Sequence, residues 1–358
     1  MRASRAVIAM SGLLIAVTAC SVPEERATAA RSTPPPPSPS ATPTPTPTTR
    51  PYTISFGGDV HFEGFLRQRL SNPSKGIGTI GAALRRSDIA MVNLETAITT
   101  GGDKAPGKEF AFRAPSTAFD TLEASGVDVA SMANNHGMDY MESGLADSLA
   151  AIKRKRFPVV GIGKDEASAY KPWYTKAGGQ RVAIIGATQV MDEHLIPSWT
   201  ASGEKGGLAS AKNEARLIQE VKRARERAHT VIVHLHWGEE LNKCPLPRQQ
   251  SLAKALARAG ADVIVGGHAH IPLAGGYAYG AYVHYGLGNF VFYSGSGPTT
   301  ASGVLTLRIH GRKVLRAAWR PARISGGVPV LLKGEARTQE LARWKSLRSC
   351  APELSDNP

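Results

Sequence analysis

The sequence has only three cysteines, no internal repeat, and no second linker like the proline-rich stretch near its N-terminus. Its first apolar run, Ala6 to Ala19, is too short to span a membrane comfortably. Because no further linker interrupts the chain, we expect one large domain over residues 52–347, followed by a C-terminal tail at 348–358. That length is enough to bury a substantial core.

The N-terminus predicts export. Two arginines precede the apolar run, and Val17-Thr18-Ala19-Cys20 places small residues before a cysteine, as in a lipobox. We expect a signal peptide over residues 1–19 and cleavage before Cys20. By resemblance to bacterial lipoproteins, Cys20 would then carry lipid and anchor the chain to the outer face of the cell membrane. An ordinary secretory signal with an incidental cysteine is the alternative.

Residues 20–51 predict a stalk behind the lipid anchor. They contain STPPPPSPSATPTPTPTTRP, in which no residue could build a core. Alternating proline and threonine favour an extended polyproline II conformation. The folded part is therefore expected to stand away from the membrane.

Acidic residues are scarce relative to basic ones, at 29 against 43, so the formal net charge is +14. The basic runs at 153–156 and 222–227 could attract anionic polymers, or they could be solvated helix faces. Nucleic acid is not expected as a partner, because export removes the chain from the compartment that holds it.

Two cysteines remain once Cys20 is lipidated. Cys244 and Cys350 could pair outside the membrane and tie the carboxyl end to the loop after HWGEE. Two unpaired thiols are the alternative.

Coarse periodicity predicts an α/β layered domain, because strands and helices alternate in the first half and strands follow one another near the end. The largely parallel sheet would gain an antiparallel portion late in the chain. We expect strands at 52–56, 89–93, 127–131, 181–187, 230–236, 262–266, 282–285, 303–309 and 314–319. Helices are expected at 65–70, 80–86, 116–125, 141–154, 211–228 and 246–259, the last with a proline in its first turn and Gly260 at its end.

Several strand-like runs end in residues that bind metal. Because the carboxyl ends of parallel strands share one sheet edge, these residues can meet in one crevice. Imidazole nitrogens together with carboxylate oxygens suit manganese, iron or zinc, whereas magnesium and calcium prefer oxygen alone. The sequence therefore predicts a metal-dependent site formed by Asp59, His61, Glu95, Asn135, His136, His234, His236, His268 and His270.

Each of these segments also has a structural interpretation. Asp59 could be a turn cap after Gly57-Gly58, where we expect the chain to turn sharply and expose the carboxylate. Glu95 could be an exposed acid at a strand end, and Asn134-Asn135 could form a turn. Their occurrence together favours the metal site.

Four further roles are expected around this site. His136 has an imidazole suited to act as a general acid. His234 and His236 share one strand face, and His234 is a candidate substrate contact. Trp237 could stack on substrate or pack at the loop base. Asn289 could line the pocket or form a structural turn.

Six motifs together resemble one family: GGDV, NLE, ANNH, HWGEE followed by a proline and Gln249, AGADVIVGGHAH, and YGLGNFVF. They are similar to the CapA-type capsule, or poly-γ-glutamate, biosynthesis proteins of the calcineurin-like metallophosphatase superfamily. The resemblance covers most of residues 52–292. It implies a four-layer α/β/β/α sandwich of the metallo-dependent phosphatase type, with a dinuclear site at one edge.

The resemblance also implies how two divalent cations, manganese, iron or zinc, would be held. Glu95 would bridge the two, and His136 would donate a proton. The remaining ligands would be Asp59, His61 and His270 for the first cation, and Asn135, His236 and His268 for the second. Many relatives have an apolar residue where this chain has His61.

The resemblance further implies an extracytoplasmic protein of capsule or poly-γ-glutamate biosynthesis. Its site would hydrolyse a phosphoester or a γ-glutamyl amide in an anionic polymer. The alternative is a non-catalytic component that grips the polymer within a membrane complex for synthesis and export.

Overall fold

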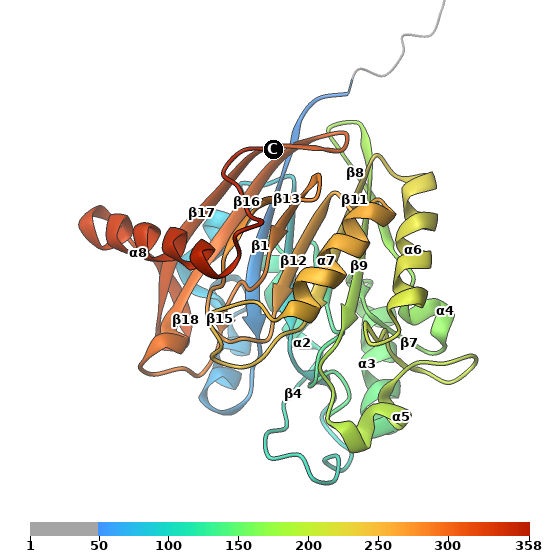
Figure 1. Cartoon of the computed structure of the whole chain (residues 1–358). Helices are drawn as coiled ribbons and strands as arrows, with labels where there is room; N and C mark the ends of the chain where they lie inside the picture. The colour runs from blue at the N-terminus through green and yellow to red at the C-terminus, as the bar shows by residue number, and fades with distance from the viewer. Residues whose placement is uncertain (1–48) are drawn as a thin grey trace, which may run out of the picture. The chain divides into compact units, whose positions relative to one another are not determined.

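Two β-sheets pack face to face, and helices cover both outer faces (Figure 1). The computed structural model describes residues 49–358, so the expected signal peptide, Cys20 and nearly all of the stalk lie outside the described residues. Within 49–358, no helix combines the length and apolarity needed to cross a membrane. The expected four-layer α/β/β/α arrangement is confirmed.

The first sheet has eight strands, in the order β18, β17, β16, β1, β2, β5, β6, with β15 also paired to β1. Strands β1, β2, β5 and β6 run parallel, whereas β16, β17 and β18 form the antiparallel portion expected late in the chain. The bounds are β1 (Tyr52–Val60), β2 (Ile89–Leu94), β5 (Val129–Ser131), β6 (Val159–Val160), β15 (Asn289–Val291), β16 (Ala301–His310), β17 (Lys313–Ser325) and β18 (Val328–Leu331).

The second sheet has six strands, in the order β13, β14, β12, β11, β9, β8. Its four central strands are parallel, and β8 and β13 are antiparallel edges. The bounds are β8 (Trp173–Ala177), β9 (Gln180–Thr188), β11 (Thr230–His236), β12 (Val263–Gly267), β13 (Gly275–Ala278) and β14 (Ala281–His284).

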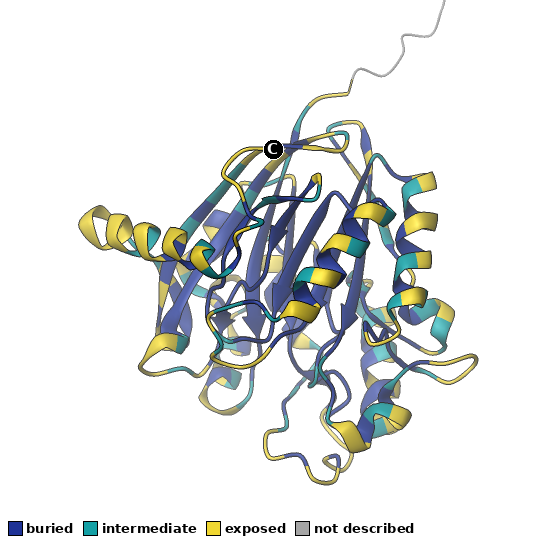
Figure 2. Ribbon diagram, viewed as in Figure 1, coloured by how far each residue is buried: buried dark blue, intermediate teal, exposed yellow. Residues whose placement is uncertain are grey.

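The longer helices bury one face and expose the other, apart from the last one, which is exposed along most of its length (Figure 2). Outside the first sheet lie α1 (Gly81–Leu84), α2 (Thr117–Ala124) and α3 (Met141–Lys155). Outside the second sheet lie α6 (Glu214–Arg227) and α7 (Pro247–Ala259), and α8 (Gly334–Ser346) packs against β17. Shorter elements are α4 (Glu166–Ala169), α5 (Ile196–Trp199), β3 (Ala97–Ile98), β4 (Arg113–Ala114), β7 (Ile162–Gly163), β10 (Gly207–Leu208) and six 3-10 turns, of which the first is Gly64–Ser71.

Alternating side chains of the first sheet feed two cores. Met91 of β2 points into the core between the sheets, together with Val231 of β11. Its neighbours Ala90 and Val92 point the other way, into the core that Phe119 of α2 helps to form. This period-two pattern keeps the strand ends in a fixed orientation, because a slip of one residue would exchange the two faces.

Most expected elements are confirmed within a few residues. Helix α7 begins with Pro247 at its first position and ends at Gly260, whose φ of 116° is left-handed. The expected helix at 65–70 is a 3-10 helix. Strands β8 and β13 and helix α8 were not expected from any pattern in the sequence. The C-terminal residues also pack on the fold, since Ser355 and Tyr277 of β13 exchange two backbone hydrogen bonds of 2.9 Å.

The expected turn at Gly57-Gly58 is wrong, because β1 runs on through both glycines to Val60. The reason for glycine is close approach. A Cβ at Gly58 would lie 1.7 Å from the Gly288 carbonyl oxygen. That same oxygen accepts a 3.0 Å hydrogen bond from the Asp59 backbone N–H, which fixes Asp59 beside β15.

Candidate metal centre

The carboxyl ends of the parallel strands in both sheets meet at one edge, as expected. Asp59 lies near the end of β1, Glu95 follows β2, Asn135 follows β5, His236 ends β11 and His268 follows β12. Except for Asn135, which is partly exposed, these side chains are buried. The structure therefore brings together residues that are up to 209 positions apart in the sequence.

Three groups of side chains each place their ligand atoms within 4.8 Å of one another. The first is Asp59, Glu95 and His270, and the second is Glu95, His236 and His268. Glu95 is thus common to both. The third group, Glu240 with His268 and His270, includes a residue that sequence analysis missed, although HWGEE contains it.

Glu95 is the feature that best fits a cation. Its side chain is fully buried, and neither carboxylate oxygen has a hydrogen-bond partner within residues 49–358. Burial and the nearby Asp59 carboxylate raise the pKa of Glu95 well above its usual value. A buried carboxylate without donors is costly, and a divalent ion between its imidazole neighbours would satisfy it.

Asp59 is held by three contacts, one from β2 and two from the segment that follows β12. Asn93 Nδ2 donates to its Oδ1 at 2.9 Å, the His268 backbone N–H donates to Oδ2 at 3.2 Å, and His270 Nδ1 lies 3.5 Å from Oδ2. Burial acts to raise the pKa of Asp59, but these contacts outweigh it and lower the pKa. Asp59 is therefore a carboxylate in a fixed orientation.

Asn135 and His236 face each other across the two sheets. Asn135 Oδ1 lies 2.8 Å from His236 Nε2, which is 3.5 Å from Glu95 Oε1. The carboxyl end of β11 thus meets the loop after β5. This places an amide oxygen beside the second donor group, where the resemblance implies a ligand.

His268 and His270 lie on a strained segment. Their φ angles are 92° and 56°, in the left-handed region that residues other than glycine rarely adopt. The Leu241 backbone N–H donates to the Ala269 carbonyl between them at 3.0 Å. Burial lowers the pKa of His268 to about 3. Burial also acts to lower the pKa of His270, but the carboxylates of Glu95 and Asp59 raise it to about 10.

Asn289 orients His270 and does not face an open pocket. It is fully buried, and its Oδ1 lies 2.8 Å from His270 Nδ1. Its Nδ2 donates to Ser294 Oγ at 3.1 Å and to the Thr299 carbonyl at 3.2 Å. These bonds select Oδ1 as the atom that faces the histidine.

His136 belongs to a network that sequence analysis did not find. Its Nδ1 lies 2.6 Å from Asp139 Oδ2, which leaves Nε2 toward Glu95 Oε1 at 3.9 Å. Lys108 Nζ contacts Asp139 Oδ1 at 3.2 Å and donates to the Asn135 carbonyl at 2.6 Å. Burial lowers the pKa of His136, and Asp139 counteracts that shift. Asp139 ends the MANNHGMD segment, but Lys108 comes from an irregular loop without periodicity.

His61 lies beside the donor groups but belongs to none of them. Its ring stacks on Phe112 at 4.5 Å between centroids and meets Phe292 edge-on at 4.3 Å. The Glu63 backbone N–H donates to its Nδ1 at 3.1 Å. Phe112 in turn stacks on His136 at 4.1 Å, so one aromatic ring separates the two imidazoles.

Two expected substrate contacts lie inside the protein. Trp237 is fully buried, donates from Nε1 to the Tyr285 carbonyl at 2.8 Å, and stacks on the Tyr285 ring. Packing therefore accounts for Trp237, and the substrate-stacking expectation is corrected. His234 is also fully buried on β11, so it cannot reach a substrate in this conformation.

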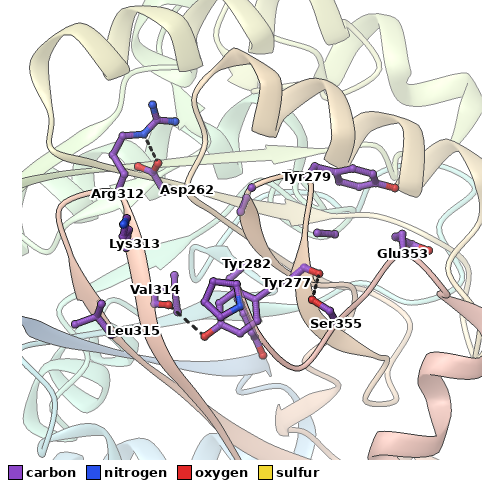
Figure 3. Close-up of a pocket in the computed structure, with 14 residues that line it drawn as sticks. Asp262, Tyr277, Tyr279, Tyr282, Arg312, Lys313, Val314, Leu315, Glu353 and Ser355 are labelled. Atoms are coloured by element: carbon purple, nitrogen blue, oxygen red, sulfur yellow. Dashed lines mark hydrogen bonds and ion pairs between the residues drawn. The ribbon is translucent and has the colours of Figure 1, made fainter.

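A separate cavity of about 700 Å³ lies at the other edge of the second sheet, near the start of β12 (Figure 3). Tyrosines and the C-terminal segment line it. Its buried acid, Asp262, already pairs with Arg225 and Arg312. The candidate site is therefore the sheet edge where Asp59, Glu95, Asn135, His236, His268 and His270 meet, called the metal edge below, where the oxygens of Glu95 have no hydrogen-bond partner within residues 49–358.

Residues 53–294 match the family model described as "Bacterial capsule synthesis protein PGA_cap". The chain belongs to this family. The match covers more than half of the chain and includes every donor of the metal edge, which confirms the family resemblance read from the motifs.

Curated proteins similar to this PGA_cap member carry names that agree with the family assignment. The chain is 31% identical over 255 residues to "Capsule biosynthesis protein CapA" of Bacillus anthracis, covering 69% of this chain and 60% of that protein. It is 30% identical over 258 residues to "PGA biosynthesis protein CapA" of Bacillus subtilis (strain 168), covering 72% and 67%. The chain thus spans about three fifths to two thirds of these relatives.

Among solved structures, a hypothetical protein from Thermus thermophilus is similar at 17% identity with a TM-score of 0.48. The alignment covers 76% of this chain and 100% of that one.

Proposed function

We propose that this PGA_cap member is a metal-dependent hydrolase that acts outside the cytoplasm on an anionic polymer of the capsule or poly-γ-glutamate type. The bond would be a phosphoester or a γ-glutamyl amide. The observation that carries the proposal is Glu95, a buried carboxylate without hydrogen-bond donors within residues 49–358 that belongs to two adjacent donor groups.

Two divalent cations are the cofactor that this donor set suits. Asp59, Glu95 and His270 would hold one cation, and Glu95, His236 and His268, with Asn135 nearby, would hold the other. Manganese, iron or zinc matches the mixture of imidazole and carboxylate ligands. When bound, such a pair lowers the pKa of a shared water and stabilises charge on the attacked group.

The protein's own residues would orient and protonate. Asp139 holds His136 through Nδ1, which directs Nε2 toward Glu95 and the reacting edge. From there His136 can donate a proton to the leaving oxygen or nitrogen. Lys108 contacts both Asp139 and the Asn135 backbone. It therefore fixes the position of the proton donor relative to Asn135, a candidate metal ligand.

The sequence supports the proposed location, and the names of relatives support the proposed substrate. The lipobox at Cys20 supports a lipid-anchored protein on the outer face of the membrane, and the linker behind it supports a stalk. The names of the two CapA relatives, which refer to capsule and PGA biosynthesis, support an acidic polymer as substrate. Membrane synthase and export proteins would then be its neighbours.

The test begins with the metal content of the purified chain, measured by elemental mass spectrometry. Hydrolysis of bis(p-nitrophenyl) phosphate and of poly-γ-glutamate is then followed in the parent and in His136→Ala. We expect about two metal ions per chain and a loss of roughly 100-fold or more in His136→Ala with its metals retained. His310→Ala, on the surface at the far end of β16, is the matched control.

Two outcomes would contradict this proposal. A parent chain without bound metal would remove its basis. A parent chain that binds metal but hydrolyses neither substrate would favour a role in polymer binding or assembly.

A further inference from the structure

A cavity of about 670 Å³ opens beside the metal centre. One wall is formed by both ends of the loop of residues 238–246, and another by the first turn of α7. His268 lines the cavity and also belongs to the second donor group, so the two spaces adjoin. The other lining residues include Gly238, Glu239, Glu240, Leu246 and Arg248.

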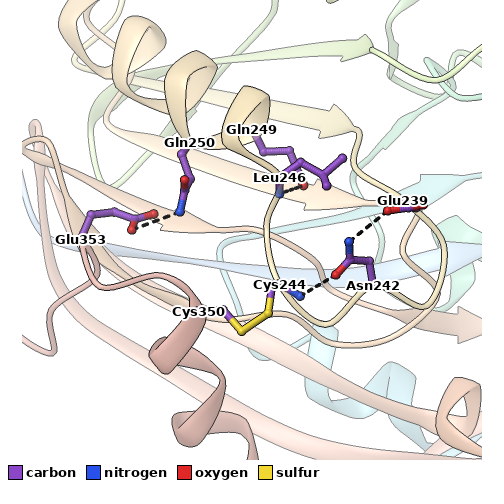
Figure 4. Close-up of a disulfide and its surroundings, with 8 residues drawn as sticks. All are labelled: Glu239, Asn242, Cys244, Leu246, Gln249, Gln250, Cys350 and Glu353. Carbon is purple, nitrogen blue, oxygen red and sulfur yellow. Dashed lines mark hydrogen bonds between the residues drawn. A yellow bond between two sulfur atoms is a disulfide. The ribbon is translucent and has the colours of Figure 1, made fainter.

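The loop that forms the first wall is anchored in place (Figure 4). Cys244 and Cys350 form a disulfide, which resolves the two alternatives left by the sequence in favour of pairing. The Leu246 backbone N–H donates to Gln249 Oε1 at 2.8 Å, and the Cys244 N–H donates to Asn242 Oδ1 at 3.1 Å. A wall fixed in this way loses little conformational freedom when a ligand binds.

The charged groups of the cavity differ in what already contacts them. Asn242 Nδ2 donates to Glu239 Oε2 at 3.0 Å, and Glu240 Oε1 lies 3.9 Å from His270 Nε2. Arg248 has no ion pair within residues 49–358, and its Nη2 donates only to the Gly238 carbonyl, at 3.4 Å. Arg248 is thus the guanidinium of this lining, and it has no counter-ion within residues 49–358.

We infer that this cavity is a substrate subsite in which Arg248 binds a carboxylate next to the bond held at the metal centre. The planar guanidinium offers paired N–H donors that match two carboxylate oxygens. In poly-γ-glutamate, each residue beside the scissile bond carries such a group. The inference rests on the proposed function for the identity of the substrate, but the binding of a carboxylate can be measured without any hydrolysis.

Binding is measured by calorimetry on the purified, metal-loaded chain, with the dipeptide γ-glutamylglutamate as the probe. Arg248→Gln removes the charge, and we expect its Kd for the dipeptide to rise about tenfold. Arg248→Lys keeps a charge without the paired donors and should fall between. Arg258→Gln, an exposed arginine in the last turn of the same helix, is the matched control and should bind as the parent does.

Hydrolysis of bis(p-nitrophenyl) phosphate supplies the second readout, because that substrate carries no carboxylate. Arg248→Gln should lower its hydrolysis far less than it weakens dipeptide binding, and Arg258→Gln should hydrolyse it as the parent does. Equal dipeptide binding in the parent and in Arg248→Gln would overturn the subsite while leaving the hydrolase intact. Arg248-dependent binding in a parent that hydrolyses nothing would instead refute the proposed function and support the subsite.

Discussion

Glu95 and Asp262 are both buried carboxylates next to strand ends, but the protein surrounds them in opposite ways. Asp262 precedes β12 and accepts hydrogen bonds from the Val231 N–H at 2.9 Å and from Arg312 Nε at 3.0 Å, besides its ion pair with Arg225. Glu95 follows β2 and accepts none from residues 49–358. The fold thus supplies hydrogen bonds and counter-ions to the Asp262 carboxylate. It leaves the lone pairs of the Glu95 carboxylate for a cation.

The largest effect is expected from Glu95→Gln. The substitution removes the charge that both donor groups share, so it should reduce bound metal from about two ions to one or none and lower hydrolysis by about 1,000-fold or more. Elemental mass spectrometry and a hydrolysis assay measure both. Full metal content in this variant would show that Glu95 is not the shared ligand.

Unfolding without metal sharpens the same comparison, because the two carboxylates should respond with opposite signs. Asp262→Asn leaves Arg225 without its partner and should lower the free energy of unfolding by about 3 kcal/mol. Glu95→Gln removes a buried charge that has no donors within residues 49–358 and should raise that free energy by about 1 kcal/mol in the presence of EDTA.

Urea unfolding of both variants beside the parent measures these changes. A loss of stability in metal-free Glu95→Gln would mean that the protein itself already satisfies this carboxylate.

Sequence alone was sufficient to predict which side chains meet at one sheet edge. The donors follow apolar runs with clear strand patterns, and parallel strands necessarily bring their carboxyl ends to one side. Asp59, Glu95, Asn135, His236, His268 and His270 were therefore found by local signals plus one topological rule. The position of helix α7 was equally accessible, because Pro247 and Gly260 mark its two ends.

What sequence could not provide depends on contacts between distant segments. Lys108 reaches Asp139 from a loop that has no periodic pattern, and Gly58 is required only because Gly288 approaches it. Trp237 follows a strand end, where exposed and buried positions give the same local signal. Its burial is decided by Tyr285, which lies 48 residues further along the chain.

His284 extends the comparison to a buried histidine outside the metal edge. Its ring packs against Trp319 and Trp344, which also stack on each other, and neither ring nitrogen has a hydrogen-bond partner within residues 49–358. Burial lowers the pKa of His284 to about 3. In the unfolded chain, His284 takes up a proton near pH 6.5. The contribution of neutral His284 to the free energy of unfolding is therefore fully present above pH 6.5 and is lost as the pH falls toward 3.

At pH 5 the loss from His284 should be about 2 kcal/mol relative to pH 7. His284→Leu removes the group that titrates. The free energy of unfolding of this variant should therefore fall less between pH 7 and pH 5 than that of the parent. Urea unfolding at both pH values, with EDTA throughout, separates the pH effect from any change in packing. An identical pH dependence in the two proteins would show that His284 is protonated without cost.

The smallest effect is expected from His61→Leu, which tests where the metal donors end. His61 packs among Phe112, Phe292 and Tyr293 and lies outside all three donor groups, so the variant should retain the metal content of the parent. Its stability should change by about 1 kcal/mol, as for an ordinary packing substitution. His270→Leu, at a donor position, should lose metal under the same conditions. Loss of an ion from His61→Leu would instead assign His61 to the first cation, as the family resemblance implies.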